Sequence, residues 1–277
     1  MKRTAVEPRP QIIAFGGCGA ADPWIDPRIF RYVVNATAVS QPRVALLTCA
    51  SGDDQRLLAR LHRLYRRMGA VTQQLKLGKS REWHHPGLLS QHFDLIHVEG
   101  GNTGFLMHQL QQFSMRSALR EAWLNGVVLT GTSAGASCWF ACAMSASLFS
   151  FVEEDETIVV QPGLGFLPYS ICVHYDHAGQ RREAYNVGIA GGLQAGFGLD
   201  HHAGLHFHGE ELTRIIALRP EAGAFEVTKQ AHRINMKRLE GEPPERLAWN
   251  ATLSRVVNSL IRRLRRKIPP ILQPKAF

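Results

Sequence analysis

A Gly-Thr-Ser-Ala-Gly segment at residues 131–135 directly follows the apolar run at residues 127–129. A serine between two glycines at the end of a buried strand is typical of a nucleophile elbow. This turn is so sharp that the residue at its apex has a strained backbone conformation. It needs a strand before it and a helix after it, which constrains the chain to an α/β architecture. The segment predicts that Ser133 stands exposed at the strand end, beside the first amides of a helix.

Apolar strand-like runs alternate with helical segments along the first half of the chain. The strand-like runs are residues 12–15, 44–48, 71–77, 93–99 and 127–129, and the helical segments are residues 26–36, 53–68, 103–112 and 114–124. This alternation predicts an α/β fold with a mostly parallel, doubly wound sheet and helices on both faces. The elbow follows a central strand. Functional sites in such sheets lie where loops leave the carboxyl ends of the strands, and the glycines at 16–17 and 100–101 fall there with the elbow.

Shorter strand-like pieces follow the elbow, at residues 157–167, 171–175, 196–199, 204–208 and 213–218. Neither an internal repeat nor a Pro-, Gly- or Ser-rich linker divides this part of the chain. We therefore expect one domain over residues 1–250 and a basic amphipathic tail over residues 251–277. The tail is predicted to pack on the domain or on a second copy of the chain in a homodimer. An anionic surface is its alternative partner.

Composition and charge exclude several classes of protein. The chain has 277 residues, of which 45% are hydrophobic and 20% charged, as in soluble globular proteins. Its net charge is +9, but seven uncompensated Lys and Arg residues lie in the tail, so the domain itself is nearly neutral and not typical of nucleic-acid binding. No apolar run approaches the ~20 residues of a membrane span, and residues 1–10 have no apolar signal segment. These features predict a cytoplasmic protein.

The five cysteines form no Cys-x-x-Cys pair and are predicted to be reduced and mostly buried. Cys138 and Cys142 stand four residues apart after the elbow, which predicts that they share one face of a helix.

A serine nucleophile needs a base, and thirteen histidines are available. His174 ends the short apolar strand at 171–175, a rigid position from which to reach another loop, and His177 is the alternative. A metal role was weighed for four later histidines, at positions 201, 202, 206 and 208. Because none has the flanking spacing of a zinc motif, we expect no metal and no cofactor.

Five segments in order carry a resemblance to a known family. They are Gly-Gly-Asn-Thr at 100–103, the elbow, Gly-Leu-Gly-Phe-Leu at 163–167, His-Tyr-Asp at 174–176 and Gly-Leu-Asp at 198–200. Together they resemble the dipeptidase E and cyanophycinase family of serine peptidases, which has a class I glutamine amidotransferase-like fold. The resemblance covers about residues 10 to 220. It implies Ser133 as nucleophile, His174 as base, and the amides of Gly101 and Ala134 as oxyanion hole. A glutamine amidotransferase would need a cysteine in place of Ser133.

The third member of the triad is not fixed by this resemblance. Family members commonly carry an acid between the elbow and the Gly-Leu-Gly segment, whereas residues 141–147 contain none. Asp200 is the first choice, and Glu153 or Glu154 in a later acidic cluster is the alternative. His201 and its neighbour His202 also depart from the small or acidic residues usual after Asp200.

The resemblance implies a serine hydrolase that cleaves peptide or isopeptide bonds of small substrates, including bonds next to aspartyl residues. Asn102 is expected to cap the next helix and to hydrogen-bond the substrate. Arg181 is expected to hold a substrate carboxylate, with a solvated helix face as the alternative. The second function considered is a catalytically impaired family member that acts as a binding or regulatory protein. The missing acid and the altered histidines motivate it.

Overall fold

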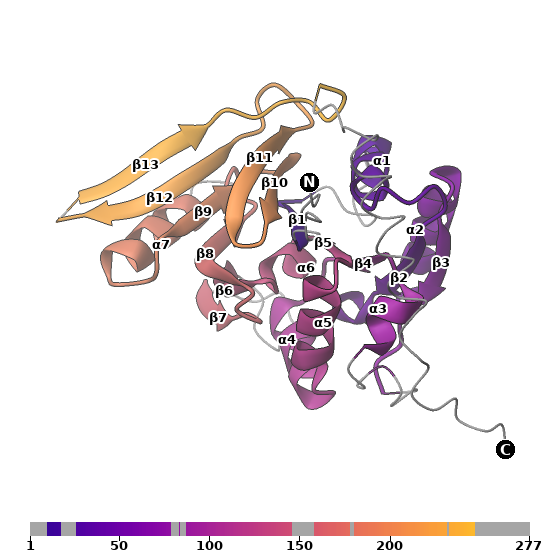
Figure 1. Ribbon diagram of the computed structural model, residues 1–277. Helices are drawn as coiled ribbons and strands as arrows, with labels where there is room; N and C mark the ends of the chain where they lie inside the picture. The colour runs from indigo at the N-terminus through magenta and orange to yellow at the C-terminus, as the bar shows by residue number, and fades with distance from the viewer. Residues whose placement is uncertain are drawn as a thin grey trace, which may run out of the picture.

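The computed structural model describes residues 10–17, 26–78, 83, 87–145, 158–177, 180–231 and 233–246. These residues form two sheets with helices around them (Figure 1). The sequence-predicted tail at 251–277 and the candidate acids Glu153 and Glu154 lie outside the described residues. Among the described residues, none of the helices has both the length and the apolar character needed to span a bilayer.

The first sheet has seven strands in the order β11-β10-β1-β5-β4-β2-β3. Five of them pair in parallel: β1 (Gln11–Phe15), β2 (Arg43–Leu47), β3 (Val71–Gln74), β4 (Leu95–Val98) and β5 (Val128–Thr132). At one edge β10 (Ala203–His208) and β11 (Glu211–Ala217) pair antiparallel. The predicted mostly parallel α/β sheet is confirmed, and β5, which leads to Ser133, lies in its centre.

Helices cover both faces of this sheet because its buried strands are apolar on both sides. Helices α1 (Pro27–Ala36) and α2 (Gln55–Arg67) pack on one face, against Ile13 and Phe15. Helices α3 (Leu88–His92), α4 (Thr103–Gln112) and α5 (Met115–Leu124) pack on the other, against Ile12 and Ala14. Alternate residues of β1 thus pack into two separate hydrophobic cores. Each fully buried Ile or Phe side chain stabilises the fold by about 1.5–3 kcal/mol.

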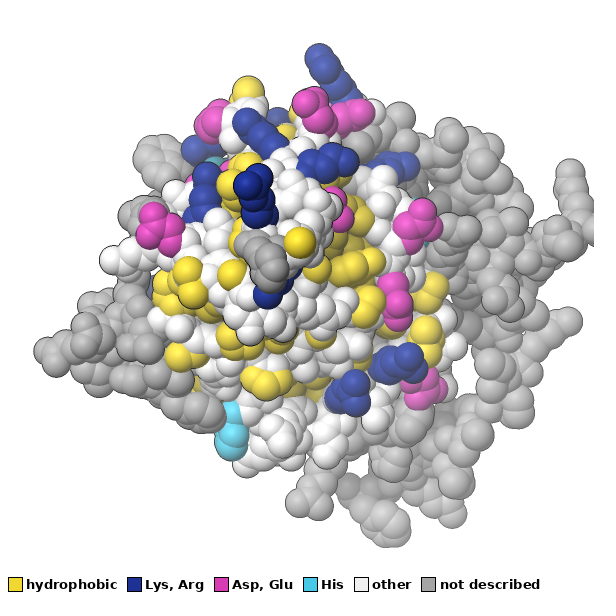
Figure 2. All heavy atoms as spheres, turned by 90° about the vertical axis from the view of Figure 1, so that its left-hand side faces the viewer, with side chains coloured by type: hydrophobic (Ala, Val, Ile, Leu, Met, Phe, Trp, Pro, Cys, Tyr) yellow, Lys and Arg dark blue, Asp and Glu magenta, His cyan; other side chains and the backbone are white. Residues whose placement is uncertain are grey.

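The second sheet was not predicted and has the order β13-β12-β9-β8-β6-β7. Its strands are β6 (Phe140–Ser145), β7 (Val159–Pro162), β8 (Leu167–Val173), β9 (Gly196–Leu199), β12 (Ala224–Gln230) and β13 (Arg233–Leu239). Helix α7 (Gln180–Ala190) packs on it through Tyr185 and Ile189. Seen from the side of this sheet, hydrophobic side chains lie among basic and acidic ones over the visible face (Figure 2).

The predicted helical pairing of the two cysteines after the elbow is wrong. Helix α6 (Ala134–Ser137) ends after a single turn, and Cys138 is its C-cap. Cys142 lies in β6, which pairs in parallel with β8. Strand pairing in the second sheet therefore overrides the helical spacing of the sequence. This early end of α6 brings β8, and the residues that follow it, close to the elbow.

Candidate active site

Ser133 occupies a strained turn between β5 and α6. Its backbone angles are φ 53° and ψ −118°, and its amide donates a 3.0 Å hydrogen bond to the carbonyl of Phe15. A Cβ atom added to Gly131 would lie 2.1 Å from the carbonyl oxygen of Gly135, and one added to Gly135 would lie 2.0 Å from that of Val98. Only glycine fits at either position, so the segment folds as the sharp elbow that its sequence predicts.

The side chain of His174 meets the elbow serine directly. Ser133 Oγ lies 2.7 Å from His174 Nε2. His174 follows the end of β8 with φ 54°, a second strained residue in the same site. Burial, followed by the nearby His201 and Arg181, lowers the pKa of His174 to about 3. The ring is therefore neutral near pH 7 and can accept a proton from Ser133.

The alternative base, His177, is exposed and lies farther along the same loop. Its amide donates to the carbonyl of His174 at 3.0 Å, and its ring centroid lies 6.4 Å from that of His201. Of the two histidines, the structure therefore brings His174 to Ser133 Oγ.

Two further side chains extend the contact between Ser133 and His174. His174 Nδ1 lies 2.6 Å from His201 Nε2, and His201 Nδ1 lies 2.8 Å from Asp176 Oδ1. The same carboxylate oxygen accepts a 2.9 Å hydrogen bond from the His201 amide. Gly17 packs against this pair of rings, since a Cβ atom there would lie 2.6 Å from His174 Cε1 and 2.8 Å from His201 Cδ2. The result is a continuous chain from Ser133 to a carboxylate.

Asp200, the first choice from sequence for the third triad position, does not pair with His174. Its Oδ2 accepts a 3.0 Å hydrogen bond from the Gly223 amide, and its own amide donates to the Gly223 carbonyl at 3.0 Å. Asp200 Oδ1 is buried and meets no hydrogen-bond donor within the described residues. Burial raises the pKa of this carboxyl. Asp200 thus anchors the end of β9, and its neighbour His201 faces His174.

Sequence reasoning missed both His201 and Asp176 as parts of the site. The available signals were the histidine pair that departs from the family pattern after Asp200 and the acid two residues after His174.

The loop after β4 lies against the elbow. A Cβ atom on Gly100 would lie 3.1 Å from Ser133 Cβ, and one on Gly101, which has φ 144°, would lie 2.2 Å from the Ala50 carbonyl oxygen. Within the described residues, the amides of Gly101 and Ala134 meet no hydrogen-bond acceptor. Ala134 is the first residue of α6, where backbone amides have no partner inside the helix. Both amides are available to a developing negative charge.

A buried carboxylate supports this loop and the elbow from beneath. Glu99 Oε1 accepts hydrogen bonds from the Gly100 amide at 2.9 Å and from Thr132 Oγ1 at 2.7 Å. Its Oε2 accepts one from His97 Nε2 at 3.1 Å, and His97 Nδ1 lies 2.9 Å from the Tyr65 hydroxyl. Burial alone would raise the pKa of Glu99, but these hydrogen bonds outweigh it and lower that pKa. Glu99 therefore ties the glycine loop to the residue that precedes Ser133.

Asn102 and Arg181, the two residues expected to bind substrate, lie at different places in the fold. Asn102 caps α4, and its Oδ1 accepts a 2.8 Å hydrogen bond from the Phe105 amide. Arg181 lies on α7, donates from Nη1 to the Val173 carbonyl at 3.4 Å, and contributes to the lowered pKa of His174. Its positive charge therefore acts on the base. Arg182 instead lies over the ring of Tyr175, 4.7 Å from its centroid.

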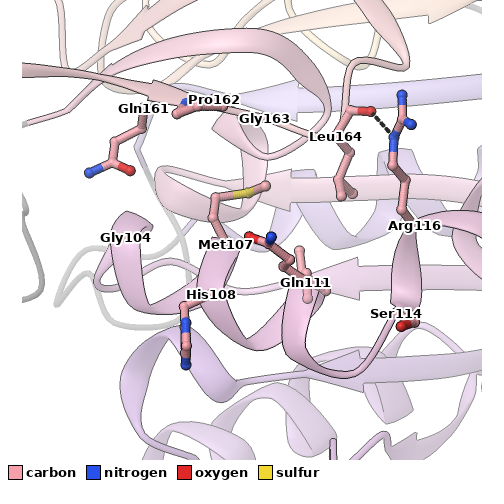
Figure 3. A pocket seen from close by; sticks show the side chains of 11 residues that line it. Gly104, Met107, His108, Gln111, Ser114, Arg116, Gln161, Pro162, Gly163 and Leu164 are labelled. Carbon is pink, nitrogen blue, oxygen red and sulfur yellow. Dashed lines mark hydrogen bonds between the residues drawn. The ribbon is translucent and has the colours of Figure 1, made fainter.

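A cavity of about 460 Å³ lies beside α4, the helix that begins after the glycine loop (Figure 3). Met107, Leu110 and Leu164 give it apolar walls, and Arg116 donates from Nε to the Leu164 carbonyl at 2.9 Å. Neither Ser133 nor His174 lines it. The cavity is thus separate from the two reacting side chains.

The later histidines weighed as metal ligands have other partners. His206 Nδ1 lies 2.8 Å from the Tyr32 hydroxyl, and the Nε2 atoms of His206 and His208 face Gln11 Oε1 at 3.0 and 3.3 Å. Over the part of the chain that the structure describes, no three His, Cys, Asp or Glu side chains lie together in a group suited to a metal ion.

Comparison with known proteins gives the family. Residues 12–215 match the model of peptidase family S51. The chain belongs to this family. It is also 35% identical over 230 residues to the uncharacterized peptidase YgaJ of Bacillus subtilis (strain 168), a match that covers 81% of this chain and 94% of that protein. The S51 chain is accordingly a peptidase of the serine type, as the ordered motifs implied.

Solved structures agree with the fold of this S51 peptidase. A peptidase from an acI-B1 Actinobacterium superposes with a TM-score of 0.60 at 14% identity, over 83% of this chain and 94% of that one. A protein from Listeria monocytogenes EGD-e superposes with a TM-score of 0.53 at 14% identity, over 83% and 98%. At such low identity these matches speak for the fold alone.

Proposed function

We propose that this S51 peptidase cleaves peptide or isopeptide bonds of small substrates, with Ser133 as nucleophile and His174 as general base. The observation that carries the proposal is the 2.7 Å contact of Ser133 Oγ with His174 Nε2 at a strained elbow. A serine hydroxyl is a weak nucleophile until an adjacent base takes its proton. The neutral, buried ring of His174 suits that role.

The reaction follows the general scheme of acyl transfer. Ser133 Oγ attacks the carbonyl carbon while its proton passes to His174 Nε2. Negative charge develops on the carbonyl oxygen, and the amides of Gly101 and Ala134 donate hydrogen bonds to it. Losing one such donor typically costs about 2.7–4 kcal/mol of transition-state stabilisation. His174 then gives its proton to the leaving amine, and a water molecule hydrolyses the acyl-enzyme with the same base.

Arg181 directs the preference for a substrate carboxylate. Its guanidinium is close enough to His174 to lower the pKa of that ring, so an aspartyl side chain bound to it would lie near the reacting carbonyl. Arginine binds carboxylates through two parallel hydrogen bonds, which fixes orientation as well as charge.

The alternative of an inactive binding protein was motivated by the missing acid. The described residues do contain a carboxylate linked to His174, through His201. This link supports the peptidase function over the alternative, and one of the altered histidines, His201, is part of it.

A fluorophosphonate probe tests the nucleophile and the base without knowledge of the substrate. We expect rapid labelling of Ser133 in the full chain, none in Ser133→Ala, and a loss of at least about 100-fold in His174→Ala. His177→Gln, which changes an exposed histidine of the same loop, is the control and should label at the wild-type rate. An unlabelled wild-type chain would support the binding-protein alternative. Full labelling of His174→Ala would exclude His174 as the base.

Specificity is tested with matched chromogenic aminoacyl substrates that carry aspartate or asparagine. Arg181→Gln should lose the preference for aspartate, whereas Arg182→Gln, the matched control on the next residue, should keep it. Equal turnover of both substrates by the wild-type enzyme would contradict the role of Arg181.

A further inference from the structure

The hydrogen-bond chain that ends at Asp176 has only one consistent direction. Hydrogen bonds from His201 outweigh the effect of burial and lower the pKa of Asp176 to about 2, so near pH 7 this carboxylate can only accept hydrogen bonds. His201 Nδ1 must therefore carry a proton. In a neutral imidazole the other nitrogen, here Nε2, is then an acceptor.

This direction fixes the tautomer of the base. His201 Nε2 accepts at 2.6 Å from His174 Nδ1, so His174 carries its proton on Nδ1. His174 Nε2 is left with its lone pair directed at Ser133 Oγ, 2.7 Å away. Every donor along the chain meets an acceptor, and the tautomer is the one that general-base catalysis needs.

We propose that His201 and Asp176 are positioning residues that replace the single acid of a serine–histidine–acid triad, and that protonation of His201 switches the peptidase off. The proposal rests on Ser133 and His174 acting as proposed above. His201 orients His174, Asp176 orients His201, and the charge of Asp176 stabilises the imidazolium that forms when His174 takes the serine proton.

The switch follows from the same hydrogen-bond count. A protonated His201 has a hydrogen on both nitrogens, so its Nε2 must donate to His174 Nδ1. The proton of His174 then moves to Nε2, where it faces Ser133 Oγ and leaves no lone pair to accept the serine proton. One added proton on His201 thus removes the base without any movement of the backbone.

The surroundings of His201 favour such a switch. Its side chain is 33% exposed, so it exchanges protons with solvent, and it pairs with the Asp176 carboxylate. The other titratable groups that face it are His174 and His177 on the loop after β8 and His202 on its own turn. Arg181 acts on the adjoining His174 from α7. Asp176 is the acid of this set, and its Oδ1 lies 2.8 Å from His201 Nδ1.

The test is the rate of fluorophosphonate labelling of Ser133 between about pH 5 and about pH 9, the range over which imidazoles titrate. A glutamine side chain can present its amide oxygen where His201 Nε2 now lies, and it does not titrate. His201→Gln should therefore keep labelling at about pH 8 within about tenfold of the wild type. The acid side of its pH profile should move to lower pH by about one unit or more, because only the buried His174 then titrates. His201→Ala should label at least about 100-fold more slowly at every pH.

Asp176→Asn gives a second and independent reading of the positioning role. Without the carboxylate, His201 loses its charged hydrogen-bond acceptor, so labelling of Ser133 at about pH 8 should be slower than in the wild type. His177→Gln, which leaves the chain of hydrogen bonds intact, should keep the wild-type profile. Thermal melts of each variant show whether it is folded.

Each possible outcome tests a separate part of the proposal. If His201→Gln is folded and labelled but keeps the acid side of the wild-type pH profile, the switch is excluded. If His201→Ala labels at the wild-type rate, His201 does not position the base. A wild-type chain that is never labelled at Ser133 would instead overturn the proposed function itself, which separates the two failures.

Discussion

Two histidine–carboxylate pairs flank Ser133, and they differ mainly in burial. His97 and Glu99 lie beneath the elbow, 3.1 Å apart, with side chains 2% and 1% exposed. His201 and Asp176 lie behind the base, 2.8 Å apart, with side chains 33% and 41% exposed. The same two side-chain types thus meet at similar distances on opposite sides of one serine.

The difference in burial gives the two pairs different roles, because Glu99 is enclosed in the core and Asp176 is in contact with solvent. Glu99 accepts hydrogen bonds from at least three donors and is almost fully buried, so a loss of any of these partners leaves a buried polar group unsatisfied. Asp176 is near solvent, where water replaces lost partners at little cost and protons exchange freely. The buried pair therefore holds the backbone in place, whereas the proposed pH switch rests on the exposed pair.

The largest expected effect is on folding, from Glu99→Ala. This change leaves the Gly100 amide, the Thr132 hydroxyl and His97 unsatisfied in the core, so we expect the free energy of unfolding in urea to fall by about 3–5 kcal/mol. Asp176→Ala, the matched change in the exposed pair, should cost less than about 1 kcal/mol. Equal losses in the two variants would contradict the comparison.

The next effect is on rate, from Asp176→Asn. Asp176 reaches His174 through one intervening residue, His201. It therefore resembles the outer carboxylate that orients a metal-bound histidine, where substitution typically lowers activity or metal affinity about 10–100-fold. We expect the labelling rate of Ser133 at about pH 8 to fall by that factor while the melting temperature stays unchanged. A wild-type rate in this variant would show that Asp176 contributes no charge stabilisation.

A smaller effect is expected in the acid dependence of stability. Because the pKa of Glu99 is lowered in the folded state, its contribution is present above the unfolded pKa of about 4.3 and is lost as the pH falls through the folded pKa. Below about pH 5, the free energy of unfolding in urea should therefore fall less steeply with decreasing pH in Glu99→Gln than in the wild type. Asp176 has the same sign, but its exposure makes the corresponding change in Asp176→Asn smaller. If Asp176→Asn alters the pH dependence of the free energy of unfolding more than Glu99→Gln does, the structural role belongs to the exposed pair and not to the buried one.

The smallest effect is expected from Asp200→Asn. Asp200 faces the Gly223 amide, and burial raises its pKa, so an uncharged amide replaces it at little cost. The labelling rate should stay within about threefold of wild type. A loss near ~10⁴-fold, as for the orienting aspartate of a well-studied protease, would return Asp200 to the triad.

Local sequence signals were enough for the parallel part of the first sheet and for the sharp turn at Ser133. Buried parallel strands such as β1 and β2 are largely apolar runs, and the elbow around Ser133 needs the glycines that its sequence supplies. The second sheet gave weaker signals. Strand β13 is exposed or only partly buried along its length, so it has no apolar periodicity to read, and β6 follows a helix that stops after one turn.

What the sequence determined by itself was the family, the elbow and the parallel sheet, because each depends on residues that are near one another in the chain. The choice between Asp200 and His201 depended on tertiary structure. They are adjacent residues after the end of β9, and their side chains point in different directions. Asp200 accepts a hydrogen bond from the Gly223 amide, whereas His201 packs beside Gly17 and contacts His174. Only the folded chain sets that direction, because the two groups that decide it, Gly17 and Gly223, lie just after β1 and just before β12.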